Sequence, residues 1–286
     1  MKTFRPNILR WHELENSDLP IYEDPLIHDQ LILAEGDSWF TLGGAPVSNL
    51  LFPMRFTRLT MIVDCASPGD TMRNMADMTH NQSLKNALDS EDYRWDLILL
   101  SGGGNDMIDH ARQLLLPAAQ RTSSPLIPSD YCDLEKLDAL IEEILSGYRT
   151  IASRRDSGPA TGTPILTHTY DYATPRNSPA RFFNLPMPTL GPWLYPALIA
   201  AEVPQDQWIA VVGFLFDNLA DGILSLALGP DPISNFHVID TRETLTPAEL
   251  GTAGESGDWM NEIHPDAEGY QKLAAQLDEK VIDLLS

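Results

Sequence analysis

The chain has 286 residues, of which 43% are apolar and 21% are charged, a composition typical of a folded globular protein. Its 41 acidic and 19 basic side chains give a formal net charge of −22, which disfavours binding to nucleic acid or to an anionic membrane surface. No stretch reaches the roughly 20 apolar residues that span a bilayer, and no apolar run follows the N-terminus as in a secretory signal. We therefore expect a cytoplasmic protein without a membrane span.

Five short apolar runs end in small or polar residues, as buried parallel strands do where they deliver loops to a site. These runs cover residues 31–34, 59–63, 96–100, 164–168 and 236–240. Apolar side chains recur at helical spacing over 134–148 and 270–284, and the apolar segment 208–228 is expected to be a well-buried helix. Strands that alternate with helices predict an α/β fold with a parallel sheet covered on both faces.

Residues 172–207 interrupt this alternation with many prolines and interleaved aromatic side chains such as Trp193 and Tyr195. The segment is too short and too rich in proline to build a core of its own. We expect one domain over residues 1–286, with this segment as an insertion above the carboxyl ends of the strands, where open α/β sheets bind ligands. The alternative is an ordered surface loop with aromatic anchors.

Two motifs indicate nucleophilic chemistry. Gly36-Asp37-Ser38-Trp39 follows the first strand, and a serine hydroxyl becomes a good nucleophile only when a base lies beside it. Taken alone, this tetrapeptide fits an ordinary helix cap better. His264 precedes a proline just before the last helix, a position that suits a general base, although single histidines are more often structural.

Two glycine-containing turns follow the second and third strands. Gly69 lies in a Pro-Gly-Asp-Thr turn, and Asn105 follows three consecutive glycines. Glycines in a row usually mean that the backbone turns sharply or approaches another group closely. The amide of Asn105 and the backbone N–H of Gly69 could donate to a developing oxyanion. The simpler interpretation of each is a turn, with Asn105 as a helix cap.

In this order along the chain, Gly-Asp-Ser, Gly-Asp-Thr, Gly-Gly-Asn-Asp and His-Pro resemble the four sequence blocks of the SGNH (GDSL-type) hydrolase superfamily. The resemblance implies a flavodoxin-like three-layer α/β/α fold whose parallel sheet has about five strands in the order 2-1-3-4-5. It also implies that Ser38 is the nucleophile and His264 the base. The implied oxyanion hole consists of Gly69, the side chain of Asn105 and the backbone N–H of Ser38.

The chain departs from that family where the superfamily usually has an aspartate three residues before its histidine, because this position is Asn261. A carboxylate orients the imidazole and stabilises the imidazolium, whereas an amide can only orient it. Three arrangements are open: Asp258 or Glu262 supplies the carboxylate, Asn261 acts as a neutral orienting residue, or the site is impaired. We favour Asp258 slightly, with Asn261 close behind.

Other polar and aromatic residues beside these motifs are candidates for substrate binding: Asp37, Trp39, His168, Tyr170 and Trp193. A cluster at a strand end that satisfies its own hydrogen bonds is the alternative for His168 and Tyr170. Cys65 and Cys132 lack the spacing of metal ligands or of a disulfide framework. No cluster of His, Asp or Glu has metal-ligand spacing either, so we expect neither a metal nor a cofactor.

Together these motifs predict a serine hydrolase that cleaves small-molecule carboxylic esters through an acyl-enzyme, with a short-to-medium acyl group or an aryl ester as substrate. Two alternatives are retained. An O-acetyl carbohydrate esterase or an acyltransferase would use the same site with a sugar hydroxyl. A non-catalytic ligand-binding relative is suggested only by Asn261.

Overall fold

The computed structural model describes residues 2–14, 24–41, 48–122, 127–180 and 190–286. Within them, six parallel strands form one sheet in the order β1-β3-β2-β4-β5-β6. The strands are β1 (Asn7–Arg10), β2 (Gln30–Gly36), β3 (Thr60–Asp64), β4 (Leu97–Ser101), β5 (Ile165–His168) and β6 (Phe236–Ile239). The helices are α1 (Trp11–Leu14), α2 (Ser38–Thr41), α3 (Met72–Ala76), α4 (Gln82–Asp89), α5 (Gly104–Leu114), α6 (Leu134–Asp156), α7 (Leu194–Ala200), α8 (Trp208–Leu228) and α9 (Ala267–Leu284).

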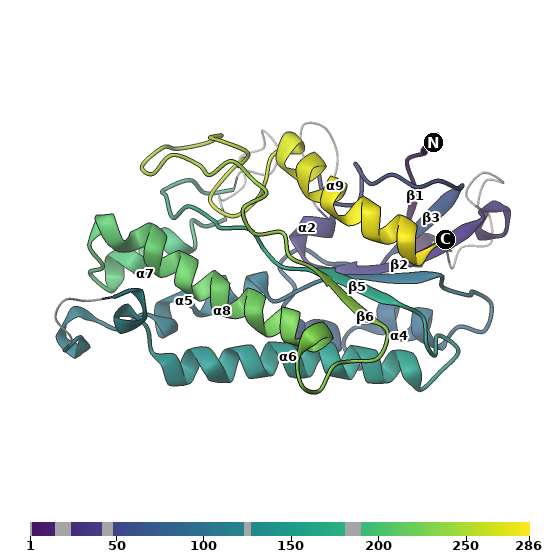
Figure 1. Cartoon of the computed structure of the whole chain (residues 1–286), viewed down its shortest axis with the longest axis horizontal. Helices are drawn as coiled ribbons and strands as arrows, with labels where there is room; N and C mark the ends of the chain where they lie inside the picture. The colour runs from purple at the N-terminus through teal and green to yellow at the C-terminus, as the bar shows by residue number, and fades with distance from the viewer. Residues whose placement is uncertain (1, 15–23, 42–47, 123–126, 181–189) are drawn as a thin grey trace.

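The sheet confirms the predicted fold class. The five apolar runs form β2 to β6, and their order in the sheet is the predicted one. Helix α9 lies on one side of the sheet, and α6 and α8 lie on the other (Figure 1). Every residue of β3 and β4 is buried, as expected for parallel strands covered on both faces.

Strand β1 was not predicted from the sequence. It pairs with β3 at the edge of the sheet, from Asn7 opposite Met61 to Arg10 opposite Asp64. Its four residues include two apolar side chains, and only Leu9 among the four is buried. An edge strand needs no continuous apolar run, so the hydrophobic pattern that reveals central strands is absent here.

Helix α8 is less buried than its apolar sequence predicts. Its buried side chains recur every three or four residues. The side of the helix that they leave out faces solvent, and Ile209 and Leu228 are exposed there. Residues 205–228 have a mean hydropathy of 1.6 over a membrane-length window, so this helix is long and apolar enough to cross a bilayer, contrary to the sequence-based expectation. Core helices of globular proteins have the same properties, and α8 packs against α6 and β6.

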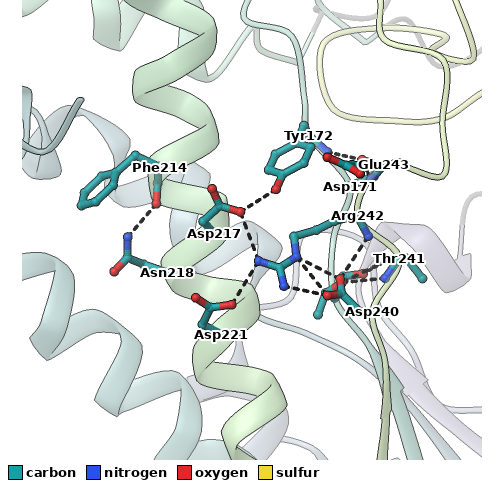
Figure 2. A network of polar contacts seen from close by, with 11 residues as sticks. Asp171, Tyr172, Phe214, Asp217, Asn218, Asp221, Asp240, Thr241, Arg242 and Glu243 are labelled. Atoms are coloured by element: carbon teal, nitrogen blue, oxygen red, sulfur yellow. Dashed lines mark hydrogen bonds and ion pairs between the residues drawn. The ribbon is translucent and has the colours of Figure 1, made fainter. Parts of the chain in front are cut away.

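Polar contacts also tie α8 to the loop after β6. Arg242 binds Asp217 and Asp221 of α8 at 3.1 and 3.0 Å, and it binds its neighbour Asp240 at 2.6 Å (Figure 2). The hydroxyl of Tyr172 donates to Asp217 at 2.5 Å. The apolar helix therefore carries two acidic residues that are paired within the fold.

The predicted insertion contains a helix of its own. Residues 181–189 lie outside the described residues, but α7 follows them and buries Leu194, Ala197 and Leu198. This helix contacts α5, which begins directly after β4 at the carboxyl edge of the sheet. The described part of the segment is therefore packed beside the strand ends.

Candidate active site

Ser38 lies at the turn where β2 ends and the short helix α2 begins. The turn is tight because the N–H of Asp37 donates to the carbonyl of Ser101, at the end of β4, at 3.1 Å. A Cβ atom at Gly36 would lie 2.9 Å from Ser101, so only glycine fits between these two strand ends. The sequence thus places the Ser38 hydroxyl at the carboxyl edge of the sheet.

His264 reaches the same edge from the loop before α9. The distance from Ser38 Oγ to His264 Nε2 is 2.8 Å, although 226 positions separate the two residues. His264 is 2% exposed, and this burial lowers its pKa to about 3, because an imidazolium is costly away from water. The imidazole is therefore neutral at ordinary pH and able to accept a proton.

Asn261 orients this imidazole. Its Oδ1 lies 3.1 Å from His264 Nδ1 and accepts the backbone N–H groups of Ile263 and His264 at 3.0 Å each. Because two backbone donors point at this atom, it must be the amide oxygen and not the nitrogen. His264 therefore carries its proton on Nδ1 and presents the lone pair of Nε2 to Ser38. The Nδ2 of Asn261 is buried without a hydrogen-bond partner among the described residues.

The structure does not support the slight preference for Asp258 as the orienting acid. The Asp258 carboxylate lies 2.5 Å from Lys272 Nζ and accepts the backbone N–H of Thr246 at 2.5 Å. Although burial opposes it, these donors lower the pKa of Asp258. Its charge is thus neutralised by a lysine of α9, and the position beside His264 Nδ1 belongs to Asn261.

Glu262 is turned away from the imidazole as well. Its carboxylate is fully buried and accepts the backbone N–H groups of Arg176, Trp193, Leu194 and Tyr195. Burial raises its pKa, and the four donors oppose that rise. Glu262 therefore fastens the start of α7 to the loop that carries His264. This role could not be predicted from the sequence, because the four donors are backbone groups.

The glycine turns bring further donors to the site. The backbone N–H of Ser67 donates to the carbonyl of Gly36 at 3.0 Å, and Asn105 Nδ2 donates to the carbonyl of Asp70 at 2.9 Å. The Gly69 turn therefore lies between the end of β2 and the start of α5. Among the described residues, no acceptor binds the backbone N–H of Ser38, that of Gly69, or the second N–H of the Asn105 amide.

Position 103 also requires glycine. Gly103 precedes the first turn of α5 with φ of +101°, and a Cβ there would lie 3.1 Å from Ile144. This left-handed conformation allows α5 to begin directly at the strand end and holds Asn105 in its first turn. The run of glycines thus serves a sharp turn and close packing.

A small pocket adjoins Ser38 and Asn105 and has a volume of about 20 Å³. Of the predicted substrate-binding residues, Asp37, Trp39 and Tyr170 line it. The hydroxyl of Tyr170 donates to Asp37 at 2.5 Å, and Asp37 also accepts from the Ser101 hydroxyl at 3.1 Å. Burial raises the pKa of Asp37 to about 6, although these two hydrogen bonds act to lower it.

The other two predicted substrate-binding residues do not line this pocket. His168 is fully buried, with its ring stacked on Trp39 at a centroid distance of 5.6 Å and its Nδ1 2.7 Å from the carbonyl of Thr169. It is therefore a core residue beneath the site and not a substrate ligand. Trp193 is partly exposed and packs edge-on against His264 at 5.9 Å, so it shields the imidazole from one side.

Several pocket residues were not predicted from the sequence. They come from four separate parts of the chain: Ile108, Asp171, Ala173, Phe216, Trp259 and Ile263. Most are apolar residues within apolar patterns, and such patterns do not show which side chain faces a cavity. Among the described residues, no group of three or more His, Cys, Asp or Glu side chains is arranged to hold a metal ion.

No family model matches the sequence, and no curated protein matches it. Solved structures do. The extracellular lipase from Streptomyces rimosus has a TM-score of 0.50 and 14% identity over 87% of this chain and 99% of its own. An acetylxylan esterase from Geobacillus stearothermophilus has a TM-score of 0.42 and 13% identity over 88% and 94%. The similarity to the lipase, together with the strand order, shows that this chain has the three-layer α/β/α fold of that enzyme.

Proposed function

We propose that the protein is a serine esterase that hydrolyses small-molecule carboxylic esters. The observation that carries this proposal is the continuous hydrogen-bonded chain from Ser38 Oγ through His264 to Asn261 Oδ1. A hydroxyl that donates to a buried neutral imidazole of fixed tautomer is an activated nucleophile. The lipase and esterase names of the structural neighbours agree with this chemistry.

In the proposed reaction, Ser38 Oγ attacks the acyl carbon while His264 Nε2 takes the hydroxyl proton. The tetrahedral oxyanion accepts hydrogen bonds from three unused donors, the backbone N–H groups of Ser38 and Gly69 and the side chain of Asn105. His264 then returns the proton to the departing alkoxide oxygen, which leaves an acyl-serine. Water, deprotonated by His264, hydrolyses that ester and restores Ser38.

Labelling and kinetics test the proposal together. A fluorophosphonate should label the wild-type protein at Ser38, as mapped by mass spectrometry, and p-nitrophenyl acetate should be hydrolysed. Ser38→Ala, purified in the same way, should lose both signals and so controls for esterases of the expression host. A protein that is neither labelled nor active would instead be a non-catalytic ligand-binding relative, and labelling at another serine would refute the assignment of the nucleophile.

Asn105→Ala tests the oxyanion hole separately. Because the amide donates mainly to the charged transition state, kcat should fall by about 10²–10³ with little change in KM. A larger effect on KM than on kcat would mean that Asn105 binds substrate in the ground state and would contradict its proposed role.

A further inference from the structure

The pocket beside Ser38 is small, and most of the side chains that line it are apolar. Its volume of about 20 Å³ holds little more than one water-sized group, for which roughly 10–15 Å³ is needed. Ile108 of α5 and Phe216 of α8 form part of its wall, together with Ile263 from the loop that carries His264. Phe216 is 4% exposed, so it is held in place by the surrounding core.

The two carboxylates of the wall already accept hydrogen bonds from the protein. Asp37 accepts the hydroxyl protons of Tyr170 and Ser101. Asp171 accepts the backbone N–H groups of Tyr172, Glu243 and Leu245 at 2.7, 2.9 and 2.6 Å. An anionic acyl group would lie beside both of these carboxylates, and burying an unpaired negative charge there is strongly unfavourable. The pocket suits a small uncharged group.

Its position relative to Ser38 and Asn105 indicates which part of the substrate it receives. Once the acyl carbon is bonded to Ser38 Oγ and the carbonyl oxygen points toward Asn105, the acyl chain must leave in a third direction. The pocket borders both residues and has room for one methyl-sized group.

Building on the esterase function proposed above, we infer that this pocket is the acyl site and that it selects acetyl esters. A butyryl chain has two more carbons than acetyl, and a pocket of about 20 Å³ has no room for them unless side chains of its wall move. One additional methylene in a fitted apolar pocket typically changes kcat/KM by about 10-fold or more. We expect kcat/KM to fall at least about 10-fold from acetate to butyrate.

The experiment compares kcat/KM for the p-nitrophenyl esters of acetate, propionate, butyrate and hexanoate in three proteins. The wild type should prefer acetate. Phe216→Ala removes the ring from the pocket wall, so the ratio of butyrate to acetate should rise by about 10-fold or more. Leu226→Ala is the matched control, because Leu226 is fully buried in the same helix but does not line the pocket. It should keep the wild-type ratio.

Each outcome bears on the inference. A wild type that hydrolyses butyrate as fast as acetate would overturn it while leaving the esterase function intact, as would a control that shifts the ratio as much as Phe216→Ala does. A wild type that is inactive on all four esters and is not labelled by a fluorophosphonate would overturn the esterase function as well. If Phe216→Ala does not fold, Ile108→Ala opens another part of the pocket wall and should produce the same shift toward butyrate.

Discussion

Replacing Asn261 by aspartate would place a carboxylate beside His264, as the resemblance of the sequence to SGNH hydrolases leads one to expect. The change keeps the shape of the side chain and the oxygen that accepts from Ile263, from the His264 backbone and from Nδ1. At the observed separation of 3.1 Å and an effective dielectric constant of about 20, the new charge would stabilise the imidazolium by about 5 kcal/mol. That energy would raise the pKa of His264 well above its wild-type value of about 3.

The consequence is a pH profile that differs between the two proteins. In the wild type, the depressed pKa keeps His264 neutral, so kcat/KM should persist to about pH 5. In Asn261→Asp, the base becomes protonated at a higher pH than in the wild type, so activity should be lost at a higher pH as the solution is acidified. At pH 9, where the base is neutral in both proteins, the variant should be faster by about 10², because part of the imidazolium charge has developed in the transition state.

The assay is kcat/KM for an acetate ester from pH 4 to pH 9, with released acetate measured by chromatography, because the absorbance of p-nitrophenol itself depends on pH. Asp37 has a pKa of about 6 and titrates within the same pH range in both proteins. The titration of His264 is therefore judged from the difference between the two pH profiles. Asp258→Asn changes the charge of the same loop and should leave the acid limb unmoved. A wild-type acid limb already near pH 7, or a variant no faster at pH 9, would refute the reasoning.

Three further changes follow from the other carboxylates. Asp258→Ala should leave kcat for ester hydrolysis within about threefold of the wild type, because the partner of Asp258 is Lys272. A fall in kcat by orders of magnitude would mean that Asp258 orients His264 after all. Glu262→Gln directs an amide NH₂ at backbone donors, so urea unfolding should show a loss of about 1–3 kcal/mol, and an unchanged midpoint would contradict its anchoring role. Tyr170→Phe removes a donor from Asp37, whose pKa is already raised by burial. Since a raised carboxyl pKa makes stability fall as pH rises from about 4 to about 6, this variant should lower Tm more at pH 8 than at pH 5 in thermal melts.

The central strands could be predicted because burial on both faces leaves a continuous apolar run in the sequence. Strand β1 could not, since two apolar residues at a sheet edge carry no such pattern. Helix α8 shows a different limit. Its composition predicted a well-buried helix, but composition does not show that one face remains exposed or that Asp217 and Asp221 pair with Arg242.

The candidate site shows what motifs convey and what they leave out. The blocks that contain Ser38, Asn105 and His264 predicted residues that the fold brings to one edge of the sheet. The preference for Asp258 rested on its charge, and the pattern could not show that Lys272, one turn into α9, already neutralises it. Phe216 gave no signal at all, because its role depends on which neighbour the α8 side chain faces.

The two carboxylates of the pocket wall have a consequence for the end of the proposed catalytic cycle. Ester hydrolysis releases an acid, which is an anion at neutral pH. Asp37 and Asp171 border the pocket, and the whole chain carries a net charge of −22. A neutral ester enters this field without penalty, whereas the carboxylate formed from it is repelled, most strongly at low ionic strength. The same walls that admit an uncharged acyl group thus favour rapid product release and weak inhibition by acetate.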